Sequence, residues 1–307
     1  MQEYLIRTQK NQQKLMKYFY FFILLTFISS QAHGQSISST DLRHIGDKIW
    51  ENECAKKIEG LTHWNNGENF GSFGIGHFIW YPEGKKERFQ ESFPDLIKFL
   101  QEKGASLPSW LTDAKGCPWR SRTEFYAHIQ DPKMIALRQL LFDTRDLQAL
   151  FITTRLEKSL PEMINKFPDK KRKEVSIVFN KLKETPQGLY ALIDYSNFKG
   201  MGTSINESYN GQGWGLLQVL ERIPPQTKNA LADFISTAKE LLTQRVQNAP
   251  TERHEEKWLK GWLNRIDSYE KFSYTERDSK VGISSEPKSR SRSRVSFHFN
   301  PNVAPFA

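Results

Sequence analysis

Apolar residues recur at helical spacing along most of this chain, and this recurrence limits the fold more than any other feature of the sequence. The two clearest stripes lie in residues 227–247 and 252–271. They consist of Leu231, Phe234, Ile235, Ala238, Leu241 and Leu242, and of Trp258, Trp262, Ile266 and Tyr269. Residues 60–76 differ, because they are rich in Gly, Asn, Thr, Trp and Phe, as is typical of turn-rich β structure. The sequence therefore predicts a mostly helical α+β fold with one small β-hairpin region.

The same spacing predicts six further helices elsewhere in the chain. They cover residues 41–57, 94–103, 133–165, 174–184, 187–197 and 212–223. The first has Thr40 or Asp41 as its candidate N-cap, since short polar side chains satisfy the free amides at a helix start. We interpret the apolar stripes of these helices as core rather than as ligand surface.

The N-terminal segment has the three parts of a secretory signal. Lysines precede an apolar run of eleven residues at 18–28, and small or polar residues follow it up to Gly34. A membrane anchor would need about 20 apolar residues, so this run is too short to span a bilayer. We predict a signal peptide over residues 1–34, with a more compact start at Met16, and a mature chain from Gln35 that is periplasmic or secreted.

The remaining chain divides into a body and a tail. Residues 35–273 are long enough for one domain, whereas residues 274–307 are rich in Ser, Arg, Pro and Asn without periodicity, which predicts disorder. The formal charge is +9, but residues 1–34 and the tail carry about two thirds of it. The body lacks a basic stripe with interleaved aromatic residues, so we expect no nucleic-acid partner.

Cysteine and histidine spacing argues against a metal site. Cys54 and Cys117 are the two cysteines, and neither has metal-ligand spacing with a histidine; HExxH and CxxC motifs are absent. A disulfide between them and two separate buried thiols remain alternatives in an oxidising compartment. We expect no metal, no cofactor and a monomer.

Glu53 interrupts the apolar face of the first predicted helix. It follows Ile45 and Ile49 at intervals of four, whereas Glu51 points to the opposite side. A carboxylate among apolar side chains loses solvation when it ionises, which favours the protonated form that a general acid needs. A structural alternative is a glutamate at the end of the stripe that pairs with Lys57.

Several short motifs resemble the lysozyme superfamily. Residues 72–77 (SFGIGH) resemble the T-x-G-x-G-H signature of phage-type lysozymes, and residues 53–58 (ECAKKI) resemble the start of goose-type lysozymes and lytic transglycosylases. Residues 191–200 (ALIDYSNFKG) resemble the helix that supports the cleft in phage-type enzymes, and residues 213–219 superficially resemble a transglycosylase G-L-M-Q motif. The string GIGHFIWYP also resembles one in an uncharacterised bacterial family, which implies no activity.

The resemblance implies a lysozyme-like domain with a glutamate general acid that acts on peptidoglycan or a related glycan. Glu53 is the expected acid, Glu59 is its rival, and Glu68 is the candidate second carboxylate, with an exposed loop glutamate as the alternative. The candidate substrate-binding residues either orient the carboxylates or line a sugar groove, although His77 also suits a structural role and the aromatic residues also suit the core. They are Ser72, His77, Trp80, Tyr81, Asn197, Tyr209, Gln212 and Trp214.

We therefore expect an exported muramidase or lytic transglycosylase. The alternative is a non-catalytic envelope protein that keeps a lysozyme-like groove to bind glycan or a partner. Two departures from the enzyme patterns favour the alternative: Cys54 stands where Ser is usual, and no second acid matches cleanly.

Overall fold

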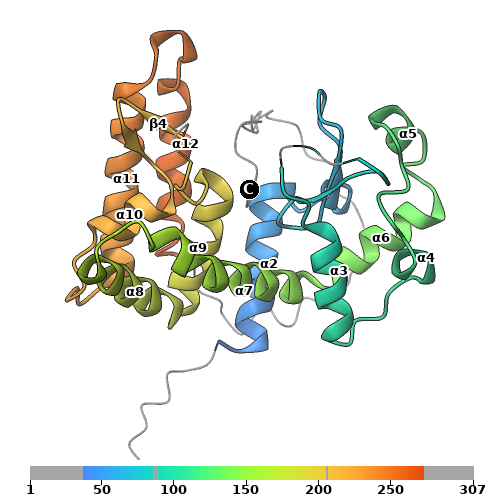
Figure 1. Ribbon diagram of the computed structural model, residues 1–307, viewed down its shortest axis with the longest axis horizontal. Helices are drawn as coiled ribbons and strands as arrows, with labels where there is room; N and C mark the ends of the chain where they lie inside the picture. The colour runs from blue at the N-terminus through green and yellow to red at the C-terminus, as the bar shows by residue number, and fades with distance from the viewer. Residues whose placement is uncertain (1–36, 86, 88, 205–206, 273–307) are drawn as a thin grey trace, which may run out of the picture. The chain divides into compact units, whose positions relative to one another are not determined.

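The twenty-residue helix α7 (Arg145–Ile164) is the element against which α2, α3, α8 and α9 all pack (Figure 1). The computed structural model describes residues 37–85, 87, 89–204 and 207–272, and all of them belong to one compact unit. The predicted signal peptide and tail lie outside these residues. Within the described part, the fold is mostly helical with two small antiparallel sheets, which confirms the predicted α+β class.

Helix α2 (Ser39–Cys54) carries Glu53 in its last turn. It begins two residues earlier than expected, because Ser38 rather than Thr40 or Asp41 is the N-cap. Ser38 Oγ accepts the amide of Asp41 at 3.0 Å and the Asp41 carboxylate accepts the amide of Ser38 at 3.0 Å, a reciprocal capping box. The helix ends when Ala55 and Lys56 take left-handed backbone angles, with φ of 49° and 57°. Both are non-glycine residues, so this ending is strained.

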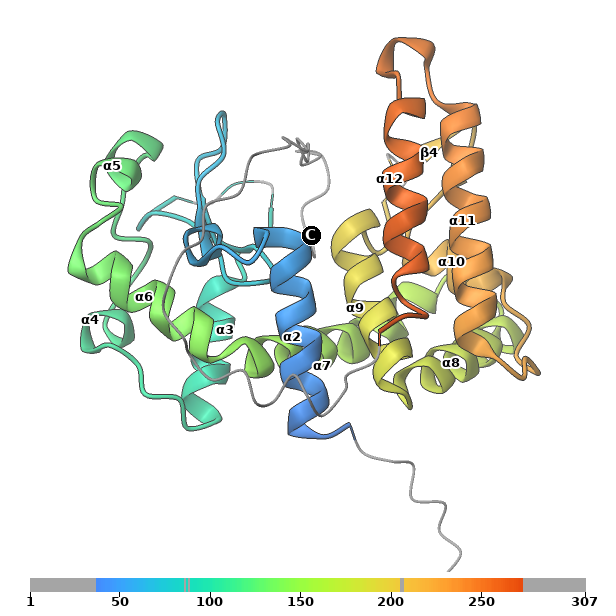
Figure 2. The ribbon, with the colours of Figure 1, turned by 180° about the vertical axis from the view of Figure 1, so that it is seen from behind.

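Close packing of α2 on α7 depends on Gly46. A Cβ at this position would lie 2.5 Å from the carbonyl oxygen of Arg145. The two helices therefore approach each other more closely than any residue other than glycine at position 46 would allow. This contact holds α2 across α7 (Figures 1 and 2).

A three-stranded antiparallel sheet follows α2 and a 3₁₀ turn, η1 (Ile58–Leu61). Its strands are β1 (Thr62–His63), β2 (Gly71–Phe73) and β3 (Phe78–Trp80), with Ser72 opposite both His63 and Ile79. This sheet lies in the predicted β region and extends slightly beyond it. All six residues of β2 and β3 are buried, so the sheet belongs to the core.

Four helices come between this sheet and α7: α3 (Phe93–Glu102), α4 (Ser109–Thr112), α5 (Arg122–Ala127) and α6 (Pro132–Asp143). The sequence predicted α3 but not α4 and α5, which are too short for a period of 3.6 to be recognised. The predicted helix 133–165 is two helices, because it breaks at Thr144, whose hydroxyl donates to the Leu140 carbonyl at 2.8 Å.

The C-terminal helices pack on one another and on α9. They are α8 (Asp169–Lys183), α9 (Pro186–Lys199), α10 (Leu216–Arg222), α11 (Ala230–Asn248) and α12 (Glu256–Asp267), with the 3₁₀ turn η2 (Thr251–Arg253) before α12. Both views show α8–α12 gathered beside α2 (Figures 1 and 2). A second hairpin, β4 (Ser208–Tyr209) and β5 (Gln212–Gly213), precedes α10.

This second hairpin corrects the predicted helix 212–223, which begins only at Leu216. Asn210 and Gly211 connect the strands with φ of 51° and 74°. Two positive φ angles define a type I′ turn, for which Asn-Gly is the favoured sequence. The dipeptide was therefore the sequence signal for this hairpin.

The core holds both cysteines as free thiols. Cys54 and Cys117 are buried and not joined to each other. Burial raises the pKa of each thiol to about 12. Of the two alternatives for this pair, the structure has the separate buried thiols.

Candidate functional site

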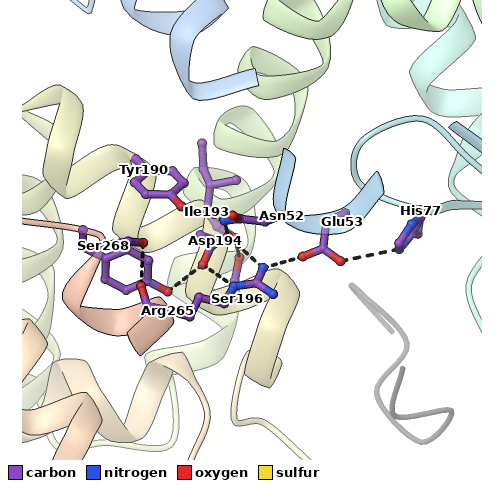
Figure 3. Close-up of polar contacts among 10 residues, drawn as sticks. Asn52, Glu53, His77, Tyr190, Ile193, Asp194, Ser196, Arg265 and Ser268 are labelled. Atoms are coloured by element: carbon purple, nitrogen blue, oxygen red, sulfur yellow. Dashed lines mark hydrogen bonds and ion pairs between the residues drawn. The ribbon is translucent and has the colours of Figure 1, made fainter. Parts of the chain in front are cut away.

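Glu53 is the centre of a polar cluster formed where α2, the β2–β3 turn, α9 and α12 meet (Figure 3). Ile45 and Ile49 of the same helix face are fully buried, and the Glu53 side chain keeps 16% of its surface exposed. Its carboxylate contacts the guanidinium of Arg265 through Oε1 and lies 4.0 Å from Nδ1 of His77 through Oε2. We call Asn52, Glu53, His77, Asp194, Arg265 and Tyr269 the Glu53 cluster.

A tight turn places His77 beside this carboxylate. Gly74 has a φ of 73°, its amide donates to the Leu61 carbonyl at 2.8 Å, and the Ile75 amide donates to Oε1 of Gln148 on α7 at 2.9 Å. His77 itself has a positive φ of 48°. Burial lowers the pKa of His77, opposed by the nearby Glu53. The imidazole is therefore held towards its neutral form.

Arg265 links Glu53 to a second, deeper carboxylate. Its Nε and Nη2 donate to the two oxygens of Asp194 at 2.8 Å each. Asn52 Nδ2 donates a hydrogen bond to the same carboxylate at 2.9 Å. The Tyr269 hydroxyl donates another to it at 2.7 Å. Burial alone would raise the pKa of Asp194, but Arg265 and these donors hold it below its usual value. Asp194 is fully buried and stays charged.

Two carboxylates thus share one guanidinium, and their surroundings differ. Asp194 accepts four hydrogen bonds and has no contact with solvent, whereas Glu53 contacts Arg265 and His77 and is partly exposed. Asp194 already offsets charge of Arg265 from the buried side. Glu53 is the carboxylate of the pair that a ligand can contact.

The other two acidic candidates lie elsewhere. Glu59 is exposed on η1, where its charge acts on Arg138 of α6. Glu68 accepts a hydrogen bond from Asn65 Nδ2 at 3.1 Å within its own loop, and burial raises its pKa. Among the described residues, no hydrogen bond or ion pair joins Glu59 or Glu68 to Glu53.

Ser72 and Trp80 lie in the first sheet, Tyr81 directly follows its last strand, and all three are packed against protein. Ser72 is 6% exposed in β2. Trp80 packs on Phe93 with ring centroids 4.6 Å apart, and the Tyr81 hydroxyl donates to the Phe89 carbonyl. Their burial leaves little surface for binding a sugar, so all three belong to the core.

Three more predicted residues gather at the second hairpin rather than at Glu53. Tyr209 and Trp214 have ring centroids 4.8 Å apart, and the Tyr209 hydroxyl donates to Glu255 at 2.8 Å. Gln212 donates to Gln244 of α11. Asn197 lies on α9, one turn after Asp194, and its amide nitrogen and oxygen are buried without a hydrogen-bond partner.

Sequence reasoning singled out Glu53 and His77 but gave no role to Asp194 or Arg265. A signal for both existed, of the kind that identified Glu53. Asp194 is a charged residue inside the apolar run of α9, and Arg265 lies between Trp262 and Tyr269 on the apolar face of α12. What the spacing does not reveal is that these faces meet Glu53, which is 212 residues from Arg265.

No family model, curated protein or solved structure matches this chain. The roles of its residues are therefore argued from their geometry. In the described part of the chain, no group of three or more His, Cys, Asp or Glu side chains is placed to hold a metal ion. None of the helices described there is both long and apolar enough to cross a membrane.

Proposed function

We propose that this protein is an exported glycosidase that cleaves the glycan strands of peptidoglycan, with Glu53 as the general acid. The observation that carries the proposal is the convergence of three separate segments. His77 of the GIGH tetrad lies beside Glu53, and Arg265 joins Glu53 to Asp194 of the ALIDYSNFKG segment. These are the segments whose sequences resemble lysozymes.

The cluster suits proton delivery to a glycosidic oxygen. Protonated Glu53 donates to the leaving oxygen, the bond to the anomeric carbon breaks, and the sugar carries oxocarbenium-like charge. Arg265 then stabilises the carboxylate that remains. Attack on the anomeric carbon, by water or by a hydroxyl of the same sugar, releases a proton that returns to Glu53. His77, held towards its neutral form, does not compete for Glu53 as a cation.

The test is digestion of purified cell walls by the mature chain and two matched variants. Glu53→Gln keeps the side-chain shape but removes the proton donor, and Glu59→Gln makes the same change at the exposed rival. We expect Glu59→Gln to match the wild type and Glu53→Gln to lose roughly 100-fold or more in rate. Mass spectrometry of the fragments separates hydrolysis from transglycosylation, since only the latter leaves anhydro ends.

A non-catalytic glycan-binding role is the second candidate. It is favoured by the ion pair that occupies Glu53 and by the burial of Asp194, which leaves one accessible carboxylate in the cluster. If all three proteins are inert yet sediment with cell walls, the glycosidase proposal is rejected and the binding role stands.

A further inference from the structure

Lys199 has a buried amine that forms no ion pair with an acidic side chain in the part of the chain that the structure describes. It is the last residue of α9 and is 4% exposed. Its ammonium nitrogen lies 3.3 Å from the ring centroid of Trp262 and 4.0 Å from that of Phe198. Burying an ammonium group is costly unless an anion or several acceptors receive its protons, and ring faces replace only part of that.

The acid whose charge acts on Lys199 already binds other donors. Glu255 is buried, and Arg245 binds both of its oxygens, at 2.7 and 2.8 Å. The Tyr209 hydroxyl adds a third hydrogen bond. Burial lowers the pKa of Lys199 well below its usual value, Arg245 and Arg265 act in the same direction, and Glu255 opposes them. An anion bound beside this amine would favour its protonated form.

A further polar group of this region lacks a partner. The indole nitrogen of Trp214 is buried and makes no hydrogen bond within the described residues. Trp214 lies beneath Arg245, whose guanidinium carbon is 4.0 Å from its ring centroid and 4.9 Å from that of Trp262. We call Lys199, Trp214, Arg245, Glu255 and Trp262 the Lys199 cluster. Its unused groups, the Lys199 amine and the Trp214 indole N–H, can both donate to an anionic oxygen ligand.

The Lys199 cluster is continuous with the Glu53 cluster. Phe198 joins them, because its ring is 4.0 Å from the Lys199 ammonium on one side and 4.4 Å from the Arg265 guanidinium on the other. Phe198 and Trp262 are both partly exposed, so Lys199 lies one ring below the surface. A polymer whose bond is cleaved at Glu53 would extend over these rings.

We propose that the Lys199 cluster is an anion subsite that binds a carboxylate of the glycan cleaved at Glu53. The inference rests on the proposed function, and it names the ligand chemistry: the lactyl carboxylate of N-acetylmuramic acid, which is free where the glycan strand carries no stem peptide. A chitin oligosaccharide has the same β-1,4-linked backbone without this group. The subsite therefore distinguishes acidic from neutral glycans of one geometry.

The test measures binding of two probes by calorimetry in the Glu53→Gln protein, which does not cleave them. The probes are a peptide-free tetrasaccharide of alternating N-acetylglucosamine and N-acetylmuramic acid, and tetra-N-acetylchitotetraose. One charge-assisted contact predicts roughly tenfold tighter binding of the acidic glycan. Lys199→Met should abolish that preference and leave the chitotetraose affinity within about twofold.

Matched variants make the result specific to this lysine. Lys260→Met makes the same change on the exposed side of α12 and should keep the preference, as should Lys199→Arg, which keeps the charge. Thermal unfolding checks that each variant folds. Equal binding of the two glycans, binding of neither, or a preference that survives Lys199→Met would overturn the subsite.

The outcomes also separate the two proposals. A preference for the acidic glycan without cell-wall cleavage by the wild type would reject the glycosidase and keep the subsite. Cleavage by the wild type without any such preference would reject the subsite and keep the glycosidase.

Discussion

At the scale of single residues, the Glu53 cluster contains one fully buried carboxylate, Asp194, and one partly exposed carboxylate, Glu53. Asp194 keeps its negative charge because it accepts four hydrogen bonds. Arg265 keeps its positive charge because the carboxylates of Asp194 and Glu53 both contact it. Such a group is costly to break from one side, since the remaining partner is left as an uncompensated buried charge.

Asp194→Asn is therefore expected to lower the free energy of unfolding by about 3–5 kcal/mol. Asp267→Asn is the matched control, because Asp267 forms a partly exposed ion pair with Lys239 and should lose less than about 1 kcal/mol. Urea denaturation of both variants measures the difference. Similar small losses would show that Arg265 does not depend on Asp194.

His77 predicts a dependence of stability on pH. Its folded pKa lies below its unfolded value near 6.5, so the unfolded chain binds more protons as the pH falls through that value. Stability is thus present above pH 6.5 and is lost towards the folded pKa, by up to about 1.4 kcal/mol per pH unit. Denaturation between pH 8 and 5 should show a shallower loss in His77→Asn. An unchanged slope would assign the dependence to other groups, such as His63.

At the scale of elements, most of the longer helices and the region of the first sheet were predictable, whereas the short helices α4 and α5 and the contacts between elements were not. Spacing identified the buried face of α2 and hence Glu53, because a helical period depends only on local sequence. The break at Thr144 and the hairpin at Asn210 depend on one hydroxyl and one turn, which a period does not register. The contact of Arg265 with Glu53 depends on how α2, α9 and α12 pack, which is a property of the tertiary structure.

The packing of α2 on α7 predicts that a glycine-to-alanine substitution changes stability in opposite directions at two helical positions. Gly46→Ala introduces a Cβ against the Arg145 backbone and is expected to cost about 1–3 kcal/mol of stability. Gly261→Ala on α12 meets nothing within 4 Å and should gain up to about 1 kcal/mol from helix propensity. Thermal unfolding of the two variants measures both, and a shift of the same sign in both would contradict the close approach.

At the scale of the whole molecule, one hydrophobic cluster extends from Ile45 to Tyr269 among the described residues, with a small satellite around Phe70 and Tyr81. The first and last described helices share this cluster and the ion pair of Glu53 with Arg265. Elements that share one core lose their stability together.

A chain of residues 35–273 should accordingly unfold in one transition. Tryptophan fluorescence and far-UV circular dichroism are expected to give the same midpoint in urea. The full mature chain serves as the control and should share that midpoint. Two separated transitions in the shorter chain would mean that α8–α12 form an independent folding unit.

The left-handed pair Ala55 and Lys56 sets two properties of this protein against each other. Glycine would relieve roughly 1 kcal/mol of strain at either position, so neither residue is the choice that stability favours. The same strained backbone fixes the end of α2 one residue after Glu53. Selection for thermal stability alone would replace this pair by glycine. The backbone after α2 would then be more flexible, and the Glu53 carboxylate would be less precisely positioned. At this turn, greater stability of the fold and precise positioning of the Glu53 side chain thus require different residues.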